Sequence, residues 1–110
     1  MTKELDFSIA NLSYLFEDEN FLLQVSRKSD KLSEFIKSSV PGAEKAWLSD
    51  FKSWEVKNRW LKSIGDICVD EYDQVFFDMG EDLFDLKDTK NYKEFKNKVL
   101  DKLDNGSLEP

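Results

Sequence analysis

Histidine is absent from this chain of 110 residues, and cysteine occurs once, at Cys68. Without histidine the chain lacks the usual general base, the usual metal ligand and every Ser/His/Asp or Cys/His catalytic arrangement. A single cysteine excludes an intrachain disulfide and a cysteine-based zinc site. Because no residues converge on a nucleophile or a general base, we expect no enzymatic activity, no cofactor and no metal.

Long hydrophobic runs are also absent. No stretch approaches the roughly 18 consecutive apolar residues of a membrane helix. The first residues, Met1 to Leu5, lack the basic segment and following apolar run of a signal peptide, so we expect a cytoplasmic location and no membrane contact. With four glycines and two prolines, the chain should connect its elements by short loops.

Apolar residues are nevertheless plentiful enough for a core, at 40% hydrophobic and 14% aromatic. A chain of this length suits one domain of the commonest size. We expect a single domain over residues 1–104. The stretch 105–110 contains Gly106 and Pro110 and has the character of a flexible tail.

Three stretches have the apolar spacing of amphipathic helices: 29–39, 58–70 and 90–103. Ser29 or Asp30 is placed to cap the first helix, and Asn58 to cap the second. Cys68 falls on the apolar stripe of the second helix, which indicates a buried small hydrophobe rather than a reactive thiol.

Alternating apolar and polar residues predict the strands. Two such runs, Leu12–Phe16 and Phe21–Val25, predict a hairpin, although the second run could instead begin one long helix. A second hairpin is expected from 45–49 and 53–57, and a further strand at 74–78. The order β-β-α-β-β-α-β-α favours an α+β fold with a small antiparallel-rich sheet and helices on one face.

Charge is divided unevenly along the chain, whose net charge is −7. Residues 66–88 hold nine acids and one base, a net charge of −8. Residues 27–62 hold nine bases and five acids, a net charge of +4. Such an excess can steer a partner, or it can form a solvated face that keeps the protein soluble.

The acidic window leads to a first hypothesis, a small non-enzymatic protein-binding module. Inhibitors and immunity-type proteins of this size present carboxylates where nucleic-acid enzymes expect phosphates, so the partner would be a protein with a basic surface. The residues expected to contact it are Asp70, Glu71, Asp73, Asp78, Glu81, Asp82 and Asp85. Asp78 and Asp82 flank Gly80, but the alternating acids of an EF-hand loop are missing, so a solvated loop is expected there.

One local pattern is more specific than the rest. A helix ends in Phe35-Ile36-Lys37-Ser38-Ser39-Val40 and is followed by Pro41-Gly42-Ala43, then Trp47, then Lys52-Ser53-Trp54-Glu55-Val56. This order resembles the HARP-like domain, a small module of annealing helicases and their phage and bacterial relatives, over residues 21–78. Glu44 departs from the family, which usually has a basic residue there, and this argues against a nucleic-acid contact by that turn.

The resemblance implies an alternative function, binding of forked or single-stranded DNA through a basic face. The implied contact residues are Arg27, Lys28, Lys37, Lys45, Lys52 and Lys57. Trp47 and Trp54 would be stacking surfaces, although tryptophans on the strands of a small domain more often belong to the core. The net charge of −7 disfavours this alternative unless the acidic window faces away from the phosphates.

Overall fold

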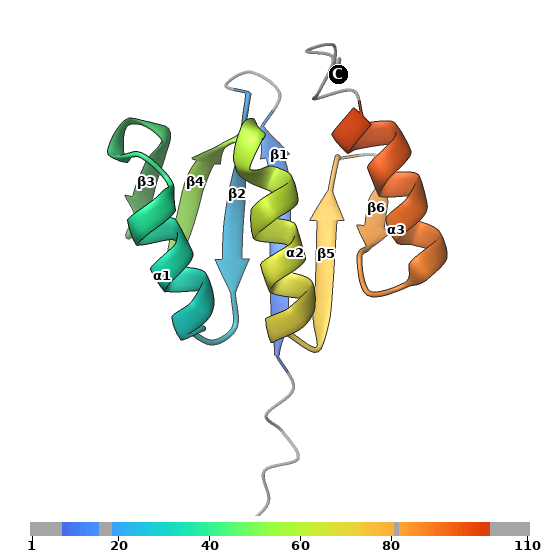
Figure 1. Ribbon diagram of the computed structural model, residues 1–110, viewed down its shortest axis with the longest axis horizontal. Helices are drawn as coiled ribbons and strands as arrows, with labels where there is room; N and C mark the ends of the chain where they lie inside the picture. Colours follow the sequence, from blue (N-terminus) through green and yellow to red (C-terminus); the bar gives the residue numbers. More distant parts are fainter. Residues whose placement is uncertain (1–7, 16–18, 81, 102–110) are drawn as a thin grey trace, which may run out of the picture.

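The computed structural model of the chain describes residues 8–15, 19–80 and 82–101 (Figure 1). Its strands are β1 (Ile9–Leu15), β2 (Asn20–Val25), β3 (Lys45–Leu48), β4 (Ser53–Lys57), β5 (Gln74–Asp78) and β6 (Leu83–Asp85). Its helices are α1 (Asp30–Ser39), α2 (Leu61–Glu71) and α3 (Thr89–Phe95). Short helical turns lie at Gly42–Glu44, Asn58–Trp60 and Lys96–Leu100. No helix within the described ranges is long and apolar enough to cross a membrane.

The strands form one sheet in the order β3-β4-β2-β1-β5-β6. Every neighbouring pair is antiparallel except β1 and β5, which run parallel. The α+β class and the antiparallel-rich sheet are therefore confirmed. The observed order contains one strand that the sequence did not predict, β6, which is only three residues long. So short a run gives no measurable alternation of apolar and polar residues.

The described chain is built from three consecutive β-hairpin and helix units, β1-β2-α1, β3-β4-α2 and β5-β6-α3. In Figure 1, α1 and α2 cross in front of the sheet and α3 lies beside β6. The first two hairpins join where β2 pairs with β4, and the third joins where β5 pairs with β1. The repeat is one of secondary-structure order only, since the sequence contains no internal repeat.

The predicted first hairpin is confirmed, and the long-helix alternative is wrong. Leu12 pairs with Leu23 and Tyr14 with Phe21 in an antiparallel register. The turn falls partly on residues 16–18, outside the described residues. Glu19, which closes it, has a φ of 58°.

The predicted cap of α1 is confirmed, while that of α2 is wrong. Ser29 Oγ accepts a hydrogen bond from the Leu32 amide at 3.2 Å. By contrast, a 3₁₀ turn precedes α2, and the Asn58 side chain instead donates to Tyr14 Oη at 3.3 Å. Asn58 lies inside this 3₁₀ turn rather than at the start of α2, and its partner Tyr14 is 44 residues away in the sequence, so no pattern within residues 58–70 reveals the contact.

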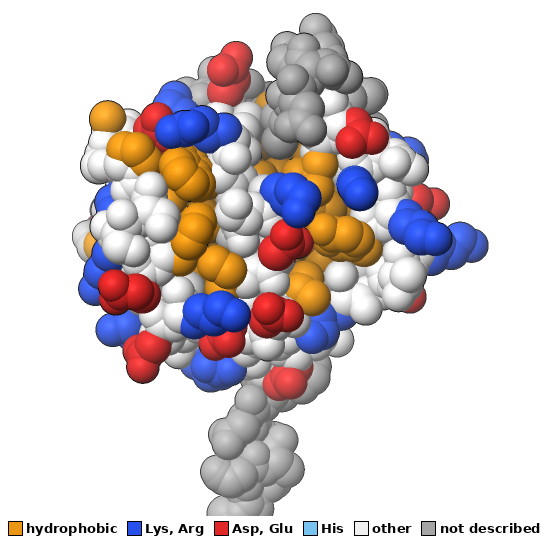
Figure 2. Space-filling model, viewed as in Figure 1, with side chains coloured by type: hydrophobic (Ala, Val, Ile, Leu, Met, Phe, Trp, Pro, Cys, Tyr) orange, Lys and Arg blue, Asp and Glu red, His pale blue; other side chains and the backbone are white. Residues whose placement is uncertain are grey.

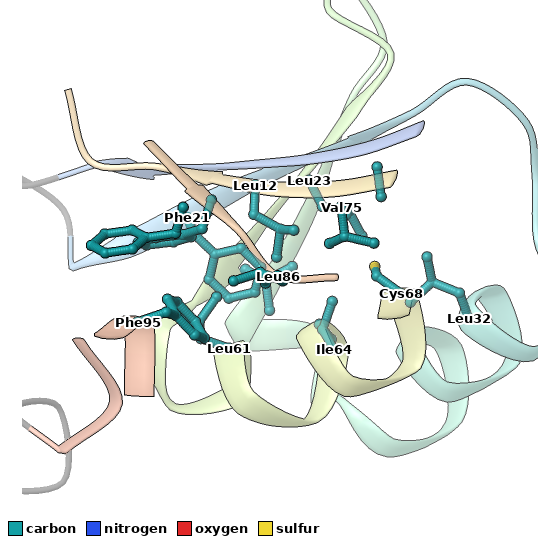
Figure 3. Close-up of a cluster of buried hydrophobic side chains, with 14 of the residues drawn as sticks. Leu12, Phe21, Leu23, Leu32, Leu61, Ile64, Cys68, Val75, Leu86 and Phe95 are labelled. Carbon is teal, nitrogen blue, oxygen red and sulfur yellow. The ribbon is translucent and has the colours of Figure 1, made fainter. Parts of the chain in front are cut away.

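Alternation along the strands sends one set of side chains into the core between the sheet and the helices (Figure 3). Leu12, Leu23 and Val75 come from the sheet, and Ile64 and Cys68 come from α2. Cys68 is fully buried, as its place on the apolar stripe predicted.

The third helix is confirmed from Thr89 onward and is more irregular than expected. Asp88 caps it by accepting from the Asn91 amide at 3.0 Å, and a wider turn continues it over Lys96–Leu100. Phe95 anchors it, because its ring lies 5.1 Å from that of Phe77 between centroids. The expected end of this helix and the expected tail at 105–110 lie outside the described residues.

Candidate functional site

A pocket of about 590 Å³ lies between α1 and the β3–β4 hairpin. Leu23, Leu32 and Ile36 supply apolar wall, and their side chains are continuous with the core. Its open rim is formed by the loop between β2 and α1 and by the turn between β3 and β4. The pocket therefore has an apolar floor and lies at the β3 edge of the sheet.

Basic side chains surround this pocket. Arg27 and Lys28 come from the β2–α1 loop, Lys37 from α1 and Lys52 from the β3–β4 turn. No aspartate or glutamate belongs to its described lining. Four of the six basic residues expected to contact nucleic acid thus meet at one place, although up to 25 residues separate them along the chain.

Two tryptophans complete the wall. Trp47 and Trp54 face each other across β3 and β4 and pack edge to face, with ring centroids 5.3 Å apart. Trp54 is partly buried against the core, whereas Trp47 keeps 52% of its surface exposed. Tryptophans on strands usually belong to the core, and here only Trp54 does so. We name the site formed by Arg27, Lys28, Lys37, Lys52, Trp47 and Trp54 the basic tryptophan pocket.

The other two basic candidates lie elsewhere. Lys45 Nζ donates to the Ile36 carbonyl at 2.7 Å and the Lys37 carbonyl at 3.2 Å, so it caps the C-terminus of α1. Lys57 follows the buried Val56 on β4, so alternation directs it to the opposite face of the sheet. Both positions depend on tertiary structure that the motif alone does not determine.

The first group of acidic candidates lies at the end of α2 and has local partners. Asp70 pairs with Lys31 at 3.8 Å. Glu71 Oε1 accepts from Ser29 Oγ at 2.7 Å. Asp73 Oδ2 accepts from the Ser8 amide at 2.8 Å. These three carboxylates therefore help to connect the described elements.

The second acidic group lies at the end of β5, in the β5–β6 turn and on β6. Asp78 Oδ1 accepts from the amide of Gly80, whose φ is +95°, and Asp82 is exposed. Asp85 Oδ1 accepts from the Lys87 amide at 3.0 Å. Glu81 lies outside the described residues.

The described carboxylates of the acidic window are spread along the sheet. Asp73 precedes β5 and Asp78 is its last residue, so five steps of about 3.3 Å place them about 16 Å apart. On the face shown in Figure 2, acidic and basic side chains alternate rather than gather by sign. Within the described ranges, no three metal-ligating side chains come together either, at Asp78 and Asp82 or elsewhere.

The Pro-Gly-Ala turn is closed by the residue that departs from the family pattern. Glu44 Oε1 accepts from Arg59 Nε at 2.7 Å and from Trp60 Nε1 at 2.6 Å. The hydrogen bond from Arg59, then that from Trp60, lowers the pKa of the Glu44 carboxyl below its ordinary value. This turn thus joins the segment after α1 to the start of α2, a structural role for the motif.

No family model, curated protein or solved structure matches this chain. The resemblance to the HARP-like domain stays a prediction from the motif.

Sequence reasoning missed the residues that support the pocket from α2. Tyr72 lines the pocket and is almost fully buried. Glu71, which the sequence places in the acidic window, accepts a hydrogen bond from Ser29 in the pocket loop. Both lie more than 40 residues from the loop that they contact. No local signal could have connected them to it.

Proposed function

We propose that this protein is a non-enzymatic binding domain that holds an unpaired nucleic-acid strand in the basic tryptophan pocket. The observation that supports the proposal is the meeting of Lys28, Lys37 and Lys52 around Trp47, in a concavity without a described carboxylate. Cations at the rim suit the phosphates of a strand, and an exposed indole suits a base. This is the ligand class that the HARP-like resemblance also implies.

Stacking explains why a single strand suits the site better than a duplex. Base stacking on an aromatic side chain contributes about 1–3 kcal/mol per base and requires a base that is free of its partner. Trp47 is 52% exposed and already held by Trp54, so its indole can receive a base without first being ordered. Phe51, in the turn of the same hairpin, is 66% exposed.

Electrostatics at the pocket differ from those of the whole chain. Although the net charge is −7, the described lining contains no aspartate or glutamate, and the nearby Glu71 carboxylate accepts a hydrogen bond from Ser29 Oγ. Asp78 and Asp82 lie at the other end of the sheet. At physiological salt, the interaction between exposed charges is largely screened beyond about 8 Å, so these two acids have little effect at the pocket. A phosphate entering the pocket therefore meets a local positive potential.

The test is fluorescence anisotropy of a labelled unpaired oligonucleotide. A Lys28→Glu, Lys37→Glu, Lys52→Glu variant should bind about a hundredfold more weakly than the original protein. The matched control changes Lys57, Lys90 and Lys93 to Glu, which alters the net charge equally on exposed residues away from the pocket. Equal losses in both variants, or no binding by the original protein at low salt, would overturn the proposal.

A second candidate function is docking of a basic protein partner at the β5–β6 turn, as for an inhibitor or immunity-type protein. Leu83 is 63% exposed there, between Asp82 and Asp85 on the edge strand β6. Charge reversal of Asp78, Glu81 and Asp82 should then abolish capture of a host protein while the circular dichroism is unchanged. Capture retained after this triple change contradicts the second candidate.

A further inference from the structure

Four contacts join the loop between β2 and α1 to the C-terminal end of α2. Arg27 Nη2 donates to the Glu71 carbonyl at 2.6 Å, and the guanidinium lies 5.2 Å from the centroid of the Tyr72 ring. Tyr72 Oη donates to the Arg27 carbonyl at 2.8 Å. Ser29 Oγ donates to Glu71 Oε1 at 2.7 Å while it caps α1. The loop that forms one rim of the basic tryptophan pocket is thus held by Tyr72, which also lines the pocket, and by Glu71.

These contacts divide the basic residues of the pocket into two kinds. The Arg27 guanidinium faces a carbonyl at the C-terminal end of α2, where the helix dipole places partial negative charge. Its positive charge is therefore partly offset by this helix end. Lys28, Lys37 and Lys52 form no ion pair with any described residue. These three ammonium groups are available to a ligand.

We infer that Glu71 and Tyr72 are positioning residues of the pocket, and that Arg27 is a tether of its loop rather than a phosphate contact. The inference rests on the proposed function and assigns separate roles within the same site. Tyr72 and Glu71 hold the loop, and the loop places Lys28 beside the other two lysines. Without the tether, part of the binding free energy is spent on ordering the loop.

Salt dependence distinguishes a tether from a phosphate contact. Each phosphate contact of a single strand contributes about 0.7 to the slope of log affinity against log salt. Changing Lys28, Lys37 or Lys52 singly to Ala should lower both the affinity and the magnitude of that slope. Tyr72→Phe and Arg27→Ala should each weaken binding about fivefold and leave the slope unchanged, because no phosphate contact is lost.

Glu71 offers a matched pair of variants. Glu71→Ala removes the acceptor of Ser29 Oγ and should weaken binding, whereas Glu71→Gln keeps a carbonyl acceptor and should restore it. If Tyr72→Phe fails to fold, this pair of variants still tests whether the contacts at the end of α2 position the loop. A residue with a merely structural role would lower the thermal midpoint but would not weaken binding by the folded protein.

Amide hydrogen exchange of residues 26–29, without any ligand, tests the tether separately. Exchange there should be faster in Tyr72→Phe than in the original protein. If the original protein binds no oligonucleotide but exchange accelerates, the proposed function fails and the tether stands. Unchanged exchange in Tyr72→Phe, or a slope lowered by Arg27→Ala, overturns the inference.

Discussion

Trp47 and Trp54 occupy directly opposed positions on β3 and β4, and their rings meet edge to face at 5.3 Å between centroids. The inner ring is partly buried against the core, and the outer ring is half exposed. One tryptophan therefore supports the other, so that an exposed indole is held rigidly at the mouth of a basic pocket.

Trp47→Ala should separate binding from stability. Loss of a stacking surface should weaken binding of an unpaired oligonucleotide by about 1–3 kcal/mol, measured by anisotropy. The thermal midpoint should change little, because the indole is 52% exposed. Leu83→Ala removes a side chain that is 63% exposed at the other edge of the sheet and should leave binding unchanged. A Trp47→Ala protein that binds normally would exclude stacking on this ring.

Glu44→Gln should reveal a pH-dependent contribution to stability. The pKa of Glu44 is lowered in the folded protein, by the hydrogen bonds from Arg59 and Trp60. A lowered folded pKa stabilises the protein above the ordinary value of 4.5, and the contribution is lost as the pH falls through the folded value. The thermal midpoint of the variant should therefore be lower at neutral pH and approach that of the original protein below pH 4.5. A difference that stays constant with pH would show that the Glu44 charge has no such role.

Ser29→Ala should cost more than the loss of an ordinary surface serine. The hydroxyl caps α1 and also donates to Glu71, and the residue is buried. Its removal should lower the free energy of unfolding by about 1–2 kcal/mol in urea titrations. Ser38→Ala in the last turn of α1, where the hydroxyl only donates to the Glu34 carbonyl, should change it by about 0.5 kcal/mol or less. Equal effects of the two changes would contradict the role of Ser29 at the helix start.

Cys68 should be inert while the protein is folded. Burial raises the pKa of its thiol to about 12, so almost no thiolate exists at neutral or mildly alkaline pH. A colorimetric thiol reagent should label it only after denaturation, at a single site because the chain has one cysteine. Rapid stoichiometric labelling of the folded protein would show that α2 does not shield it.

Much of the fold could be predicted because its signals are local. Alternation at Leu12 and Tyr14 gave the first hairpin, and the apolar stripe through Ile64 gave α2. The strand β6 and the true role of Asn58 could not be predicted. The first is too short to show a period, and the second depends on a contact with Tyr14, 44 residues away.

The site could be predicted only in part, because the order of charged residues along the sequence does not determine which of them lie close together in the fold. Lys28, Lys37 and Lys52 meet in one pocket, whereas Lys45 and Lys57 are directed elsewhere by a helix end and by strand alternation. The described acids of the window are likewise spread in space, from Asp73 before β5 to Asp78 at its end. Exposure of Trp47 follows from the edge position of β3, which no motif specifies.

The most direct test of the binding account is a titration of isotope-labelled protein with an unpaired oligonucleotide, followed by nuclear magnetic resonance. The account predicts chemical-shift changes at the Trp47 indole N–H and at the amides of residues 26–29 and Lys52. The Trp60 indole, which donates to Glu44, should not shift. Absence of any shift at Trp47, or shifts confined to the β5–β6 turn, would contradict it.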